Sequence, residues 1–241
     1  MNKAVILLAV AAVVFIASCS SVKEPAFEDS CAEINRTAER NNCYVELAVS
    51  LNITEPCSSI ADNDKLVESC YAKVSISAVN RLGCQEIQDD KIRSYCLAKV
   101  AGVRAELPIC ENIDNSDWKD ICYYDVAEAT NKTEICGNIV WNPLSDKCYD
   151  SLARKINYGA GCVFIKDGDM RERCFLAVAI STENADLCNE LDIKGSGWTC
   201  FQKVAKAKRD AGICGLIGVK SVEDNCRRVV NDYIAETVNS T

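Results

Sequence analysis

The chain has 241 residues, 17 Cys, no His and a formal net charge of −8. The missing His excludes Ser-His and Cys-His catalytic pairs, imidazole metal ligands and the haem-attachment CxxCH motif. The acidic balance argues against nucleic acid as a partner, because phosphate binding needs a basic face. Cysteine at this density is typical of oxidising compartments, where disulfides hold small modules together.

Residues 1–18 have the features of a lipoprotein-type signal peptide. Lys3 provides a short basic start, and residues 4–17 form an apolar run that is too short for a comfortable membrane span. The Ile-Ala-Ser-Cys motif that ends at Cys19 resembles the lipobox of prokaryotic lipoproteins. This resemblance implies cleavage before Cys19 and a lipid on its sulfur. The alternative is ordinary secretory cleavage nearby, for instance after Ser20. Either process takes the chain out of the cytosol.

The remaining 16 cysteines define an internal repeat. The steps between them alternate between 12 and 14 residues, with a single step of 13 in the second copy. This pattern is a 26-residue repeat in eight copies. The copies begin at Cys31, Cys57, Cys84, Cys110, Cys136, Cys162, Cys188 and Cys214. We therefore expect residues 31–241 to form a helical-hairpin repeat domain, which residues 19–30 tether to the membrane.

Apolar residues keep helical spacing around these cysteines. Ile or Leu stands three residues after the first Cys of every copy, and Val or Leu stands four residues after the second. An apolar residue such as Ile92, Trp118 or Leu144 also precedes the second Cys by four. Such offsets place these side chains and the Cys on one helix face. Each copy therefore predicts a short helix, a tight turn and a longer helix of about 12–15 residues.

Polar residues at the predicted helix starts are candidate N-caps. For the longer helices these residues lie in the turns, and Ser116 is one of them. For the short helices they stand three or four residues ahead of the first Cys: Thr54, Thr133, Asn184 and Asp210.

Disulfides within each repeat are the favoured use of the cysteines. Pairing across the 14-residue step would leave the first and last cysteines unpaired, and pairing equivalent cysteines of adjacent copies would need a longer reach. Sequence alone does not prove connectivity. The favoured pairs are Cys31–Cys43, Cys57–Cys70, Cys84–Cys96, Cys110–Cys122, Cys136–Cys148, Cys162–Cys174, Cys188–Cys200 and Cys214–Cys226.

Metal binding and thiol redox chemistry are the rival uses of cysteine. Zinc sites, iron–sulfur sites and thioredoxin-like sites usually need close CxxC pairs, and the chain has none. A 26-residue unit is also too small to be held by hydrophobic burial alone. In the simple loop-closure model each bridge contributes about 3 kcal/mol. The predicted fold is thus an all-α solenoid of eight disulfide-stapled two-helix repeats.

Two further patterns follow the repeat. An aromatic residue or Leu follows the second Cys in seven copies, and it either lines a ligand-binding face or, as we favour, packs one copy on the next. The last copy instead carries polar residues at its end, including Arg227 and Asn231, and is expected to cap the solenoid.

Four asparagines begin Asn-X-Ser/Thr sequons and are candidate glycosylation sites: Asn35, Asn52, Asn131 and Asn239. Asn52 and Asn131 occupy the same repeat position, just past the second helix, and Asn157 falls there without a sequon. The alternative interpretation is that Asn simply terminates the helix there.

The expected function is non-catalytic binding. The sequence shows no glycine-rich phosphate loop, no GxSxG motif and no recognisable carboxylate pair for acid–base work. Neither a metal nor a cofactor is therefore expected, and an enzyme is disfavoured. We expect a lipid-anchored protein on the outer face of the membrane or in the periplasm, whose solenoid binds another protein or a glycan. The alternative is a structural spacer of the cell envelope without a specific ligand.

The stapled-hairpin hypothesis makes a direct prediction for peptide mapping. Non-reducing digestion with a free-thiol count should find no free thiol among the sixteen repeat cysteines. It should also find eight linkages, each spanning twelve or thirteen positions. Several accessible thiols, or bound zinc, would contradict the hypothesis.

Overall fold

The computed structural model describes residues 30–239, apart from the side chains of residues 193, 194, 238 and 239. The described part is helical and contains no strand, which confirms the predicted all-α repeat fold. The expected signal peptide, the lipid site at Cys19 and nearly all of the expected tether lie outside the described residues. None of the described helices combines the length and apolarity that crossing a bilayer requires.

Each copy contributes one long helix, as the spacing predicts. These helices run from the turn of the copy past its second Cys. They are α1 (Thr37–Leu51), α2 (Asp64–Ser77), α4 (Asp90–Arg104), α6 (Ser116–Thr130), α7 (Asn142–Lys155), α8 (Gly168–Ser181), α9 (Trp198–Lys208) and α10 (Lys220–Asn239).

The short helices hold the first Cys of copies two to eight. Most of them are 3₁₀-helical, as is common for single turns. They are η1 (Glu55–Ser59), α3 (Arg81–Gln85), α5 (Leu107–Glu111), η2 (Thr133–Asn138), η3 (Gly159–Phe164), η4 (Ala185–Glu190) and η6 (Ala211–Ile217). In the first copy Cys31 lies in a turn instead. A π-helical turn, η5 (Ile193–Gly197), precedes α9.

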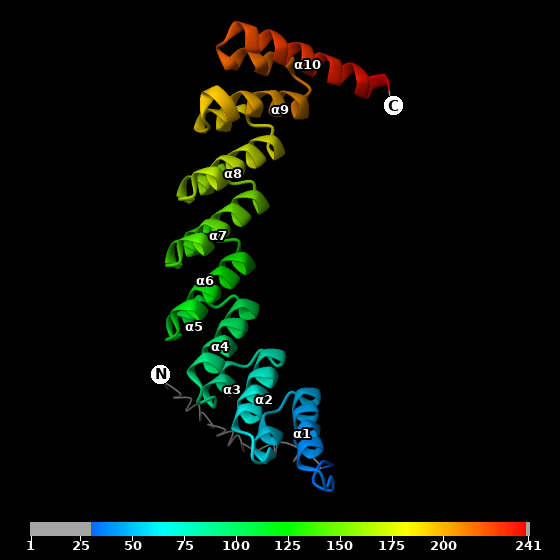
Figure 1. Ribbon diagram of the computed structural model, residues 1–241, viewed down its shortest axis with the longest axis vertical. Coiled ribbons are helices and arrows are strands. Elements are labelled where there is room, and N and C mark those ends of the chain that lie inside the picture. The colour runs from blue at the N-terminus through cyan, green and yellow to red at the C-terminus, as the bar shows by residue number, and fades with distance from the viewer. Residues whose placement is uncertain (1–29, 240–241) are drawn as a thin grey trace, which may run out of the picture.

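The copies stack into an elongated, curved solenoid, with α1 at one end and α10 at the other (Figure 1). Successive long helices pack on one another along the stack. Each short helix packs between the long helix of the preceding copy and the long helix of its own copy. The result is two layers, one of long helices and one of short helices, joined by an apolar interior.

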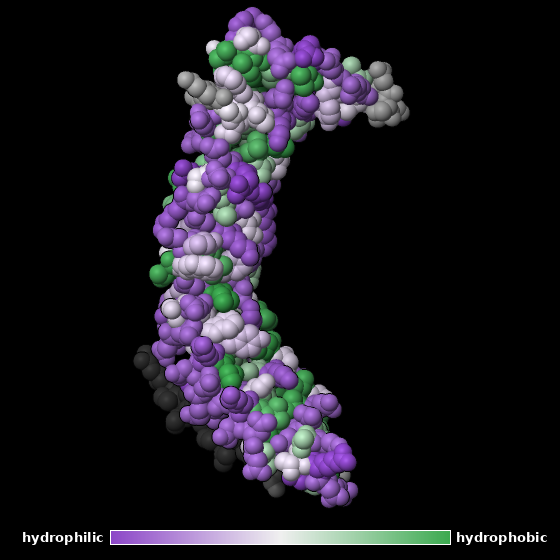
Figure 2. Space-filling model, in the orientation of Figure 1, coloured by the Kyte–Doolittle hydropathy of each residue, from purple (hydrophilic) through white to green (hydrophobic). Residues whose placement is uncertain are grey.

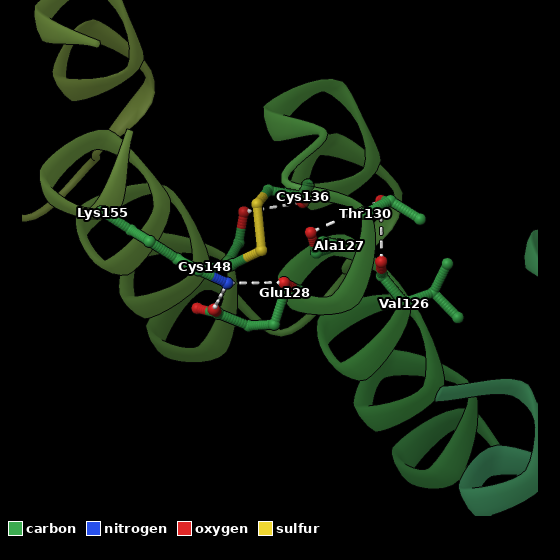
Figure 3. The surroundings of a disulfide bond; sticks show 8 residues. Val126, Ala127, Glu128, Thr130, Cys136, Cys148 and Lys155 are labelled. Atoms are coloured by element: carbon green, nitrogen blue, oxygen red, sulfur yellow. Dashed lines mark hydrogen bonds and ion pairs between the residues drawn. A yellow bond between two sulfur atoms is a disulfide. The ribbon is translucent and has the colours of Figure 1, made fainter. Parts of the chain in front are cut away.

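A disulfide links the two layers within every copy. The paired Cα atoms lie 5.5 to 5.8 Å apart, within the usual range for a disulfide. Figure 3 shows Cys136 of η2 bonded to Cys148 of α7 beside the end of α6. Eight bridges in one chain indicate an oxidising, extracytoplasmic setting.

The periodic apolar residues form the interior along the whole solenoid. From the second copy on, the Ile or Leu after the first Cys and the Val or Leu after the second are buried, as with Ile113 and Val126. In the first copy the equivalent Ile34 and Leu47 are only half-buried, because no preceding copy covers them. At the opposite end Arg227 and Asn231 are exposed, in agreement with the predicted polar cap.

The long helices of the first seven copies end beside a residue in the left-handed backbone region. Three of these residues are Asn, with φ near 55°: Asn52, Asn131 and Asn157. Asn tolerates this conformation better than other non-glycine residues. This observation supports the helix-terminator interpretation of the asparagine position.

The predicted caps of the short helices are half right. Asn184 accepts a hydrogen bond from the backbone N–H of Asp186, and Asp210 accepts one from that of Gly212. Thr54 stands at the N-cap of η1 without a side-chain bond. Thr133 is the first residue of η2, and Lys132 occupies the N-cap position before it.

At four junctions neighbouring copies are joined by a side chain two positions before the second Cys, which we call the latch. In the fourth copy Asp120 accepts the backbone N–H groups of Val140 and Trp141 at 3.0 and 2.8 Å. In the fifth copy Asp146 accepts those of Lys166 and Asp167 at 2.8 and 2.9 Å. Both carboxylates are buried. The latch thus binds the turn of the following copy, where those donors need partners.

The latch also occurs at the first two junctions. Glu68 accepts both N–H groups of the third copy's turn at 3.0 Å. Asn41 accepts the N–H of Ala61 at 3.2 Å and donates to its carbonyl oxygen at 2.8 Å. An amide can do both, whereas a carboxylate only accepts.

The third copy has Ser94 at the latch position and holds its neighbour differently. Gly102 of α4 lies so close to α6 that an added methyl group would lie 2.8 Å from Cβ of Asp125. Next to this contact, Lys99 Nζ pairs with Asp125 at 2.9 Å. Close approach of α4 and α6, together with this ion pair, therefore joins the third and fourth copies without a latch carboxylate.

Removing a latch should weaken one junction. We expect Asp146→Ala to destabilise the oxidised protein by about 2–4 kcal/mol, because two part-buried backbone N–H groups lose a charged acceptor. Guanidinium denaturation followed by circular dichroism measures this change. The matched control is Asp150→Ala, which removes only a partly exposed ion pair with Arg154 and should cost less than about 0.5 kcal/mol. Equal losses in the two variants would contradict the latch.

Candidate binding groove

Comparing the copies position by position identifies residues that the scaffold does not require. The residue directly before the second Cys is polar in six copies: Asn42, Ser69, Lys147, Arg173, Thr199 and Asn225. In the third and fourth copies it is Tyr95 and Ile121. In the fifth copy the two latched turn residues are Val140 and Trp141, where the sixth copy has Lys166 and Asp167. At the position of Trp141 the seventh and eighth copies also carry an apolar residue, Ile193 and Val219. The bulky apolar exceptions Tyr95, Ile121, Val140 and Trp141 fall in three consecutive copies.

The structure brings these exceptions together around two adjoining hollows. One hollow, of about 460 Å³, is lined by Lys91, Ile92, Tyr95, Asn115, Asp117, Trp118 and Ile121. The other, of about 770 Å³, is lined by Ser116, Asp117, Asp120, Ile121, Val140, Trp141 and Leu144. Asp117 and Ile121 line both hollows and form their shared wall. We call the two hollows together the aromatic groove. It crosses the first turns of α4, α6 and α7.

The predicted core residues Ile92, Trp118 and Leu144 are only half-buried, and they form part of this groove. Their inner sides pack on the core, and their outer sides face the hollows. Trp118 meets the ring of Tyr95 edge to face, with ring centroids 5.0 Å apart. This pairing is a favourable aromatic geometry and fixes both rings across the junction of α4 and α6.

The turn that Asp120 binds carries the most exposed apolar residues of the groove. Val140 is 84% exposed and Trp141 is 61% exposed. Their backbone N–H groups are both bound by Asp120, so the turn is held although its side chains face solvent. Large apolar side chains held outward at a defined place are typical of binding sites. The face shown in Figure 2 is mainly hydrophilic, with separate hydrophobic areas.

Two polar side chains of the groove already make hydrogen bonds within the scaffold. Both carboxylate oxygens of Asp120 accept turn N–H groups. Asn115 caps α6 by accepting the N–H of Trp118 at 3.1 Å. The cap prediction for Ser116 is therefore wrong by one residue, because the Asn115 side chain already reaches this donor. Within residues 30–239, Lys91 and Asp117 are exposed and make no side-chain hydrogen bond or ion pair.

The lining of the groove is suited to apolar contact. It combines an apolar, aromatic lining with two uncommitted charges, and its one buried carboxylate is used by the scaffold. Among the described residues no group of three or more His, Cys, Asp or Glu side chains is placed to hold a metal. All sixteen described cysteine sulfurs are in disulfides.

The predicted glycosylation sites lie apart from this groove's lining. Asn35, Asn52 and Asn131 are exposed. The side-chain oxygen of Asn52 also accepts a hydrogen bond from Ser77 of the next copy at 3.0 Å. Asn239 is the last residue of α10, and its side chain lies outside the described part. Modification of these residues stays a prediction.

The aromatic positions after the second Cys support the packing interpretation. Tyr44, Tyr149, Phe175 and Phe201 are buried. Burial raises the pKa of Tyr149, as expected for a phenol that has lost solvent. Its ring stacks on Phe164 of the next copy, with centroids 5.1 Å apart. These residues therefore join copies along the short-helix layer.

The groove residues that were not singled out from the sequence include Tyr95, Asp117, Ile121, Val140 and Trp141. The signal that identifies most of them is departure from the polar pattern of the other copies. Neither a protein-family model, nor a curated protein, nor a solved structure matches the chain. Function is therefore inferred from the groove itself.

Proposed function

We propose that the chain is a non-catalytic, lipid-anchored binding protein outside the cytosol, and that its aromatic groove binds another protein. One observation carries the proposal: Tyr95, Ile121 and Val140 occupy positions that are polar or small in the remaining copies, and these residues line one groove together with Trp141. A spacer has no use for exposed Val140 and Trp141, because both add apolar surface in contact with water.

The lining favours a protein over a glycan. Sugar hydroxyl groups need hydrogen-bonding partners in a site, and polar groups left without partners reduce affinity. In this groove both oxygens of Asp120 already accept backbone N–H groups, and Lys91 and Asp117 are the charged groups left to bind a ligand. Aromatic anchors in an apolar recess are instead typical of protein interfaces.

The lipid anchor accounts for the proposed location. A lipid on Cys19 would hold the solenoid at the membrane surface, with residues 20–30 as the connection. One acyl chain binds membranes only weakly, so stable anchoring needs more than one. Lipoprotein processing supplies this, since the lipobox resemblance implies a lipid-modified cysteine at the new N-terminus.

The anchor is tested by Cys19→Ser. In a bacterial host we expect the parent protein to enter the detergent phase of a phase-separation assay, and the variant to leave it. Mass spectrometry of the N-terminal peptide gives the modification directly. An unmodified N-terminus at Ser21 in the parent protein would establish secretory cleavage and contradict the anchor.

Binding is tested by photo-crosslinking in the native envelope. A photoreactive residue in place of Val140 should give one protein adduct of defined mass. The matched control is the same residue in place of Lys166, the equivalent latched position one copy further on, where no such adduct is expected. Trp118→Ala should weaken the adduct about tenfold, as loss of an aromatic anchor does.

The other results of this experiment discriminate between the functions. Self-adducts of equal yield at both positions would support the spacer and contradict the proposal. Heterogeneous carbohydrate adducts confined to position 140 would identify a glycan site and contradict a protein ligand.

A further inference from the structure

The geometry points to the kind of segment that the aromatic groove binds. We infer that it takes an extended peptide running along the solenoid, with two apolar residues three positions apart and a basic residue between them. This inference rests on the proposed protein-binding function.

The spacing of the two apolar residues follows from the arrangement of the hollows. One hollow spans the starts of α4 and α6, and the other spans the starts of α6 and α7. Neighbouring packed helices lie about 8–10 Å apart, so the hollows succeed each other at about that interval. Three residues of extended or polyproline chain cover about 9–10 Å. Residues i and i+3 of such a chain therefore reach one hollow each.

Aromatic walls favour an extended chain over a helix. Trp118 and Tyr95 form one wall of the first hollow, and Trp141 lines the second. Grooves with aromatic linings are a common way of binding extended, proline-rich segments, whose conformation is set before binding. A helix rises only about 1.5 Å per residue and would need about seven residues between anchors.

Asp117 selects the charge of the intervening residue. It lies on the wall that both hollows share and is exposed, without an ion pair among the described residues. Neighbouring Asp120 is buried and bound to two N–H groups. Lys91 lines the first hollow only. The peptide residue that passes over the shared wall therefore faces the Asp117 carboxylate, which has no ion-pair partner among the described residues. The formal net charge of −8 further favours approach of a basic segment.

Charge reversal tests this assignment. The probe is the labelled peptide Gly-Ser-Leu-Pro-Arg-Leu-Gly-Ser, and its partner carries Glu in place of Arg. Fluorescence anisotropy with the full oxidised chain should show at least about fivefold tighter binding of the Arg peptide. Asp117→Lys should reverse this preference. Replacing either Leu of the peptide with Ser should abolish binding.

Asp169→Lys is the matched control. Asp169 occupies the repeat position of Asp117 two copies further on, also in the first turn of a long helix. The Asp169→Lys variant makes the same change in net charge and in the charge at the helix start as Asp117→Lys does. Because Asp169 does not line the groove, this variant should leave the preference for the Arg peptide unchanged. Circular dichroism of both variants shows whether the fold is retained.

The outcomes separate this inference from the proposed function. A preference for Arg that survives Asp117→Lys, or disappears equally in Asp169→Lys, overturns the role of Asp117. If neither peptide binds while crosslinking at position 140 still yields one protein, the extended basic segment is wrong and the binding function stands. If both experiments are negative, the binding function fails as well.

Discussion

The fold depends on a covalent bond in a unit that is too small to fold by burial alone. Each copy has about two helices, and its interior is little more than an Ile, a Val, an Ala and two half-cystines. The bridge fixes the point where the short element meets the long helix, and this places the periodic side chains in one interior. The first copy shows the same constraint, because Cys31 is bonded to α1 although it lies in a turn.

The disulfides act only within copies, so the contacts that pack neighbouring copies on one another are non-covalent. The buried Val and Ala rows supply the area, and the latch supplies direction by binding two N–H groups of the next turn. The third copy lacks a latch carboxylate, and there Gly102 and the pair Lys99–Asp125 join it to the fourth copy instead. Another ion pair between copies, Lys155–Glu128, lies beside the Cys136–Cys148 bridge (Figure 3).

Asp120 belongs to both the scaffold and the candidate site. Asp120 joins the fourth copy to the fifth, and the same two hydrogen bonds hold the turn that carries Val140 and Trp141. Exposed side chains can thus be held in place by the repeat itself and need no mobile loop. A turn that is already fixed loses less conformational entropy when a ligand binds. Variation at a few positions that the interior does not need is sufficient to build a groove on a regular solenoid.

The sequence by itself determined the repeat, its boundaries, the helical faces and the favoured disulfide pairs. These features are local or periodic, and sixteen cysteines in register leave few arrangements that pair all of them. The spacing also predicted the buried Ile113 and Val126, because each lies within one helical turn of its Cys.

Only the tertiary structure decided which residues of different copies meet. Asp120 contacts a turn twenty residues away, and Tyr95 meets Trp118 across a junction, so neither contact has a local signal. The outer side of Trp118 became part of a groove because the adjoining copies leave it open, although its helical position is that of a core residue. Stacking, which brings together residues about one repeat apart, turns scattered apolar exceptions into one site.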